Sequence, residues 1–236
     1  MSLPSQLTQK AEPPAIHVPV RLEDPQGKQL EISRETAALA EERGLDEEAI
    51  TAYLEVRKLD PTAVGVAHRL AVLYDRSGMT DAASREYQAA LRESPQNADI
   101  QCDYGYFLYS TGRDAEAENS LRESLRLSPE HRQATINLAL VIGNQGRYDE
   151  SLELFTKAIG PAAALHNVGM LKLRAGEMDS ARQMLSEASR RDPSIAQSPG
   201  VLERLNPEYR NGMQAEATAD SSGRNVDPAG VVFLAN

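Results

Sequence analysis

A repeat of 34 residues constrains the fold of this chain more than any other feature of its sequence. Glycines recur at this spacing and prolines follow them at the same spacing: Gly44, Gly78, Gly112 and Gly146, then Pro61, Pro95 and Pro129. A fifth, shorter unit has its glycine at Gly176 and its proline at Pro193. A chain of 236 residues with such a period is expected to be a stack of similar units rather than one compact core.

Each unit predicts two helices joined by a turn. Segments such as VAHRLAVLYDRSG place apolar residues at helical spacing before the glycine, which can end a helix in the left-handed conformation. Acidic residues open the second segment, and proline ends it because proline has no N–H group to donate. Small residues such as Ala83 let the two helices approach, while larger ones such as Tyr87 fill the space between hairpins. The pattern therefore predicts an all-α fold.

The spacing of apolar and small residues in the first helices resembles the tetratricopeptide repeat (TPR) family. The matching triplets are Leu70, Ala71 and Tyr74; Tyr104, Gly105 and Leu108; and Leu138, Ala139 and Ile142. The resemblance covers residues 30–193 and implies a right-handed α-solenoid of about five helix-turn-helix hairpins with a C-terminal capping helix.

The chain is expected to divide into an arm, a repeat array, a cap and a tail. The proline-containing residues 1–29 are expected to form a mobile arm, residues 194–206 the capping helix and residues 207–236 a disordered tail. The five units are expected at 30–63, 64–97, 98–131, 132–161 and 162–193. Because Gly160-Pro161 comes two residues early in its unit, the second helix of unit four is expected to end there, with a changed twist toward unit five.

Composition excludes several classes of function. A net charge of −10 opposes nucleic-acid binding, because phosphate contacts need clustered Lys and Arg. One cysteine and four scattered histidines provide no metal site, and we expect no cofactor. No apolar run is long enough to span a membrane, and no secretory signal is visible, so a cytoplasmic location is expected.

Catalysis is not expected, because no nucleophile, base and orienting group share one place in the predicted hairpins. Cys102 and His68 fall at the same register of adjacent hairpins, too far apart for an easy hydrogen bond. An RNA-reading array of similar hairpins is the other class considered. The negative charge and the glycine, alanine and proline positions oppose it.

The family geometry implies that the first helices line a concave groove that binds a partner. The candidate groove residues are His68, Arg69, Asp103, Tyr106, Tyr109, Asn137, Leu140, Asn144, His166, Asn167 and Met170. Asn137 and Asn167 fall at the same place in successive hairpins, where amides can hold a peptide backbone. The alternative is that each amide only bonds a neighbouring helix. Tyr106 is the expected anchor of the groove, with one of the two tyrosines packed against the adjacent helix.

The sequence therefore predicts a non-catalytic scaffold that binds an extended or helical segment of another protein. One alternative is an accessory subunit of a secretion or pilus-assembly system. Another is a self-associating protein, a homo-oligomer, whose C-terminal VVFLAN segment occupies the groove.

Overall fold

A computed structural model describes residues 24–196, and this part of the chain is entirely helical. Its elements in order are α1 (Pro25–Glu42), α2 (Asp46–Leu59), α3 (Val66–Arg76), α4 (Thr80–Glu93), α5 (Ala98–Ser110), α6 (Asp114–Leu127), α7 (Arg132–Asn144), α8 (Tyr148–Ile159), α9 (Pro161–Arg174), α10 (Met178–Arg191) and the 3₁₀-helix η1 (Pro193–Ala196). The all-α prediction is confirmed.

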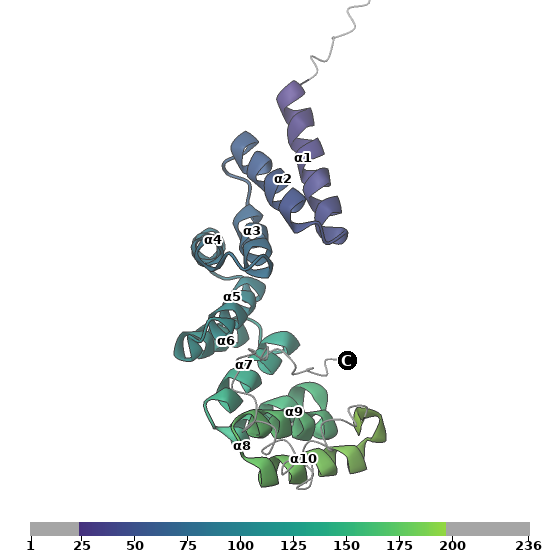
Figure 1. Cartoon of the computed structure of the whole chain (residues 1–236). Coiled ribbons are helices and arrows are strands. Elements are labelled where there is room, and N and C mark those ends of the chain that lie inside the picture. The colour runs from purple at the N-terminus through teal and green to yellow at the C-terminus, as the bar shows by residue number, and fades with distance from the viewer. Residues whose placement is uncertain (1–23, 197–236) are drawn as a thin grey trace, which may run out of the picture.

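The helices pair in chain order into five hairpins, numbered one to five here, which stack into a single curved column (Figure 1). Within each hairpin the two helices pack against each other along their length. Each of the first helices α3, α5 and α7 also contacts the first helix of the next hairpin, and no comparable contact joins successive second helices within residues 24–196. The column therefore curves toward its first helices, which line the concave side.

The first helix begins earlier than the sequence predicted. Residues 25–29 were assigned to the arm, but they form the first turns of α1, so that boundary is wrong. The physical reason is a good helix start: the Asp24 side chain accepts a hydrogen bond from the Gln26 N–H at 3.1 Å, and Pro25 occupies the first helical position. Residues 1–23 of the predicted arm lie outside the described residues.

At the other end of the repeats, Pro193–Ala196 forms a 3₁₀ turn, η1, that contacts both α9 and α10. The capping helix was expected to start at residue 194, and its first three residues belong to this turn. The remainder of the predicted cap, residues 197–206, and the predicted tail, residues 207–236, lie outside the described residues.

The early end of the second helix in hairpin four is confirmed. Helix α8 ends at Ile159, and Gly160 alone links it to α9, which starts at Pro161. Gly160 has a φ of 83° and a ψ of 164°, a conformation that a residue with a Cβ rarely adopts. Because no longer linker intervenes, α8 and α9 pack more extensively than the facing helices of the other hairpin junctions.

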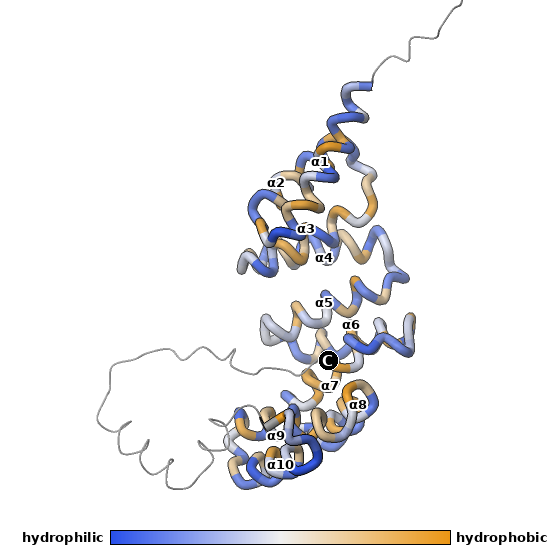
Figure 2. Tube along the Cα trace, turned by 90° about the vertical axis from the view of Figure 1, so that its right-hand side faces the viewer, coloured by the Kyte–Doolittle hydropathy of each residue, from blue (hydrophilic) through white to orange (hydrophobic). Residues whose placement is uncertain are grey.

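The core runs through the column as a chain of clusters between hairpins. The small residue five positions after each turn glycine is fully buried in every hairpin: Ala49, Ala83, Ala117, Ser151 and Ala181. Tyr87, Leu121 and Phe155 fill the space beside them. Helix α7 is the most buried element, since every residue from 134 to 143 is buried, and Figure 2 shows the apolar stretches of α7 and α8.

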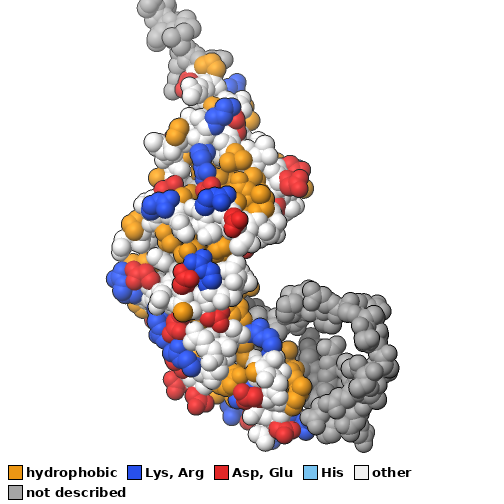
Figure 3. Space-filling view, turned by 60° about the vertical axis from the view of Figure 1, so that its left-hand side comes forward, with side chains coloured by type: hydrophobic (Ala, Val, Ile, Leu, Met, Phe, Trp, Pro, Cys, Tyr) orange, Lys and Arg blue, Asp and Glu red, His pale blue; other side chains and the backbone are white. Residues whose placement is uncertain are grey.

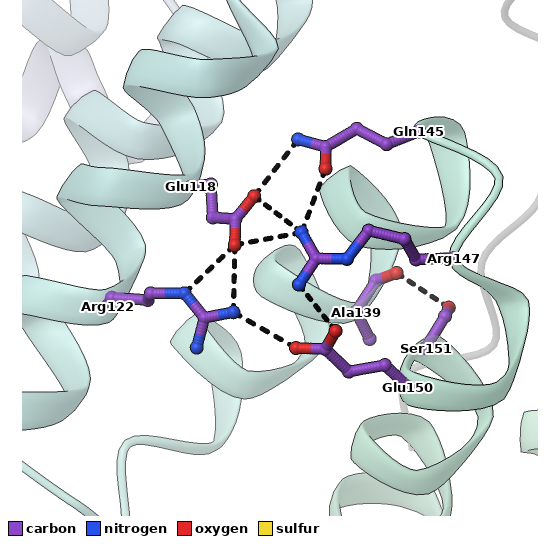
Figure 4. A network of polar contacts seen from close by, with 7 residues as sticks. All are labelled: Glu118, Arg122, Ala139, Gln145, Arg147, Glu150 and Ser151. Carbon is purple, nitrogen blue, oxygen red and sulfur yellow. Dashed lines mark hydrogen bonds and ion pairs between the residues drawn. The ribbon is translucent and has the colours of Figure 1, made fainter.

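A network of ion pairs joins hairpins three and four (Figure 4). The Glu118 carboxylate on α6 accepts hydrogen bonds from Arg122 on its own helix and from Arg147 at the start of α8. Both arginines also bond Glu150, at 3.0 and 2.5 Å. Beside this network, the Ser151 hydroxyl donates to the Ala139 carbonyl at 2.7 Å and ties α8 to α7. The middle of the column is thus fixed by charge pairs as well as by apolar packing.

Candidate partner-binding face

Two of the three tyrosines of α5, Tyr106 and Tyr109, lie on the concave side with different exposure. Tyr106 is 45% exposed, whereas Tyr109 is half-buried and packs against the two largest core clusters. Their ring centroids are 6.3 Å apart, with the rings tilted by 44°. The expectation that one tyrosine packs against its neighbours holds for Tyr109, and Tyr106 keeps a free ring face.

Arg174 connects three hairpins on this side. Its Nη2 group donates to the Tyr109 hydroxyl at 3.1 Å and to the Asn144 Oδ1 atom at 2.5 Å. Asn144 in turn donates from Nδ2 to Asp114 at 2.7 Å. These contacts hold Tyr109 and Asn144 of hairpins three and four against α9, and the guanidinium itself stays exposed.

The candidate groove residues predicted from the sequence do not include Arg174, although its position in the repeat could have indicated that it lies on this side. Asn144 and Arg174 both stand two residues before the turn glycine of their hairpins. Residues at one register of adjacent hairpins come close together in this fold. We name the surface formed by Tyr106, Tyr109, Asn144 and Arg174 the tyrosine–arginine face.

Three candidates at the N-terminal end of the groove make polar contacts between adjacent hairpins. His68 Nε2 lies 2.9 Å from Asp103 Oδ2, which links hairpin two to hairpin three. The exposed Arg69 lies 3.7 Å from Glu41 of hairpin one. These side chains therefore join neighbouring hairpins to one another when no partner is bound.

Asn137 does not face solvent as the groove prediction required. Its side chain is buried, and its Oδ1 atom accepts a hydrogen bond from Gln133 Nε2 at 2.9 Å. Its Nδ2 group donates to Cys102 Sγ at 3.5 Å. For Asn137 the alternative holds: its amide bonds a neighbouring helix, because α5 and α7 approach closely enough to cover it.

Asn167 and Leu140 are buried as well, so their predicted exposure is also wrong. Leu140 belongs to the core cluster between hairpins four and five. Asn167 is 1% exposed, and neither its Oδ1 nor its Nδ2 atom has a hydrogen-bond partner. The short linker at Gly160 brings α9 against α8 and contributes to this burial. A row of exposed amides is therefore absent from the described part of the groove.

His166 and Met170 complete the predicted set on α9. Both are half-buried, and burial lowers the pKa of His166 below its ordinary value. The neutral imidazole is favoured at neutral pH for that reason. On α9 they lie two turns and one turn before Arg174, so they extend the tyrosine–arginine face toward the N-terminal end of that helix.

The one cysteine of the chain is not available for chemistry on this face. Cys102 is buried, and burial raises the pKa of its thiol to about 12, which keeps it protonated and unreactive. Among residues 24–196 no three His, Cys, Asp or Glu side chains gather in a way that could hold a metal ion. Within that range, no helix combines the length and apolarity that crossing a membrane requires.

Charge is distributed evenly over the molecular surface seen in Figure 3. Lys and Arg side chains alternate with Asp and Glu along the column on that face. Among residues 24–196, many charged side chains form pairs, for example Arg57 with Glu86 and Arg76 with Asp46. Such a face carries no continuous basic stripe of the kind that binds a nucleic-acid backbone.

Comparison with known proteins identifies the type of repeat. The model of the cilia and flagella-associated protein 70 middle TPR-like domain matches residues 67–167. The type IV pilus assembly protein PilF of Pseudomonas aeruginosa is 29% identical over 137 residues, which is 55% of this chain and 54% of that protein. The chain spans about half or less of the length of the curated relatives that it matches.

Solved structures share the same architecture. The crystal structure of MamA protein superposes with a TM-score of 0.59 and 21% identity, over 73% of this chain and 96% of MamA. YrrB, a TPR protein with an unusual peptide-binding site, superposes with a TM-score of 0.56 and 23% identity, over 76% of this chain and 99% of YrrB. At these identities the similarity establishes a TPR fold and leaves the ligand open.

Proposed function

This chain is a tetratricopeptide repeat protein, and we propose that it is a non-catalytic scaffold whose tyrosine–arginine face binds a segment of another protein. The observation that carries the proposal is the exposed ring of Tyr106 beside a fixed Tyr109–Arg174 contact. Tyr and Arg are the residues most enriched among interface positions that dominate binding energy. A face already fixed by hydrogen bonds loses little conformational entropy when a partner binds.

The chemistry of this face indicates the kind of segment that it would take. The free face of Tyr106 suits an apolar or aromatic side chain. Arg174 has five N–H donors, and its contacts within the described residues come from Nη2 alone, so Nε and Nη1 remain for a carboxylate. The proposed ligand is therefore an extended or helical segment that carries an apolar side chain near an acidic one.

The test is affinity capture from host lysate with cross-linking and mass spectrometry, followed by binding assays with peptides of the captured protein. We expect Tyr106→Ala with Arg174→Gln to weaken binding of the mapped peptide about tenfold or more. Leu54→Ala on α2 is a matched control, because Leu54 is also an exposed large side chain but lies outside the face. Equal affinity of the wild type and the double variant would exclude this face as the binding surface.

A second candidate function is an accessory role in pilus assembly. The similarity to PilF supports it, as does a superposition on the structure of PilW, a type IV pilus biogenesis factor, with a TM-score of 0.58. Capture of pilus components that the Tyr106→Ala and Arg174→Gln variant loses would support this function. Capture of the chain itself, lost on removal of residues 213–236, would instead support self-association through the C-terminal segment.

A further inference from the structure

Hairpin one exposes an apolar stripe that the other hairpins bury. Ile32 and Leu39 on α1 are seven residues apart, with Thr36 between them at the i+4 position, so all three lie on one side of the helix. Ile32 and Leu39 are each 46% exposed. Exposed large aliphatic side chains in a row are unusual for a helix that packs against a neighbour on another side.

The repeat itself shows what this stripe does elsewhere. Side chains at the registers of Ile32 and Leu39 in hairpins two to five are no more than 7% exposed: Val66, Ile100, Ala134 and Ala164, then Leu73, Phe107, Val141 and Leu171. In hairpin two, Val66 and Leu70 cluster with Val56 of α2, and Leu73 clusters with Ala40 and Ala49 of hairpin one. The stripe is thus the surface through which a hairpin stacks on the second helix of its neighbour.

On hairpin one the stripe borders an open groove between α1 and α2. The groove has a volume of about 640 Å³, and Ile32, Thr36 and Ala52 contribute to its floor. Its acidic side chains are Glu47, Glu48 and Glu55, and no Lys or Arg lines it. Glu55 pairs with Lys58, whereas no ion pair involves Glu47 or Glu48 within residues 24–196.

We propose that this α1–α2 face binds an amphipathic helix of another protein, with an apolar stripe at i, i+4 and i+7 flanked by Lys and Arg. The repeat supports the shape of this ligand, because the surface at the same position in hairpins two to five packs against a helix. The charge argument is the acidic rim, which would repel a second acidic helix and attract a basic one. This surface is separate from the tyrosine–arginine face, so either proposal can fail without the other.

The experiment uses two fluorescent peptides and the full chain. The first peptide has the sequence of α2, Asp46–Leu59, with Asp46, Glu47, Glu48 and Glu55 replaced by Lys. The second is the unchanged α2 sequence. The four changes in the first peptide leave Ile50, Tyr53 and Val56 in place, through which α2 clusters with α3. We expect saturable binding of the basic peptide, about tenfold or more tighter than binding of the unchanged one at physiological salt.

Variants of the chain then locate the binding. Ile32→Ser with Leu39→Ser is expected to weaken binding of the basic peptide about tenfold, with an unchanged melting temperature because both side chains are exposed. Leu54→Ser with Val64→Ser, also exposed apolar positions of the same region, is the matched control and is expected to stay within about twofold of the wild type.

Three kinds of result would overturn the proposal. One is a negative binding assay, that is, no saturable binding or an equal loss in the control variant. Another is a concentration-dependent dimer that Ile32→Ser with Leu39→Ser abolishes, which would make a second copy the occupant. The third is binding of the basic peptide only after removal of residues 1–23, which would make a segment of the same chain the occupant.

Discussion

Hairpins one and two carry the same residue at the same register with opposite surroundings. Leu39 of α1 is exposed, whereas Leu73 of α3 is fully buried between Ala40 and Ala49. Both leucines stand five residues before their turn glycine, so the local sequence pattern does not distinguish them. Within residues 24–196 a hairpin precedes α3 and packs on Leu73, whereas none precedes α1, so in a stacked repeat the neighbouring hairpin decides whether this position is core or surface.

The largest expected effect comes from replacing these two leucines in turn. Leu73→Ala should lower the free energy of unfolding by about 2–5 kcal/mol, because it leaves a cavity between hairpins one and two. Leu39→Ala should stay within about 0.5 kcal/mol of the wild type, since solvent already contacts the side chain. Urea denaturation followed by circular dichroism measures both. Equal losses would mean that Leu39 is covered in solution and would break the comparison.

Asn137 and Asn167 occupy the same repeat position in hairpins four and five but differ in hydrogen bonding, which gives a second, smaller contrast. Asn137 has Gln133 four residues earlier as a hydrogen-bond partner, whereas the residue four positions before Asn167 is Ala163. Asn167→Leu should raise the free energy of unfolding by about 1–2 kcal/mol, because it removes a buried amide with no partner. Asn137→Leu should lower it, since Gln133 loses its acceptor. The same denaturation assay tests both, and a destabilised Asn167→Leu variant would indicate a partner for that amide.

These contrasts separate what the sequence could predict from what it could not. Glycine and proline positions predicted the hairpins and the early end of α8, because backbone limits of those residues act locally. The predictions that placed Asn137, Leu140 and Asn167 in an open groove were wrong. Their burial depends on how closely α5, α7 and α9 approach, which is set by packing between hairpins and not by the period. Arg174 was left out of the candidate set. Its repeat position indicates the concave side, but its bonds to Tyr109 and Asn144 depend on the packing of two other hairpins.

Charge pairs provide a third test of the difference between the middle of the column and its N-terminal end. Glu118 bonds both Arg122 and Arg147, whereas Arg34 of hairpin one pairs, among residues 24–196, only with Asp60, at 3.1 Å. Glu118→Gln should lower the free energy of unfolding by about 0.5–1 kcal/mol at low salt, and by less at 1 M salt where screening weakens the network. Asp60→Asn should have a smaller effect. A larger loss for Asp60→Asn would show that the end of the column is more firmly fixed than its middle.

The smallest expected effect is the pH dependence of stability that His166 causes. His166 of hairpin five and Arg34 of hairpin one stand at the same position relative to the turn glycine. Arg34 is exposed, whereas burial lowers the pKa of His166, so the folded chain binds a proton there less readily than the unfolded chain. Stability is therefore fully retained above the ordinary histidine pKa of about 6.5 and falls as pH drops through the lower folded value.

We expect the melting temperature to decline modestly between about pH 7 and pH 5, and His166→Gln to remove part of that decline. His68→Gln is the matched control, because it removes a histidine on a different hairpin that contacts Asp103 and not His166. An unchanged slope in the His166→Gln variant would mean that this imidazole is open to solvent, as the equivalent side chain of hairpin one is.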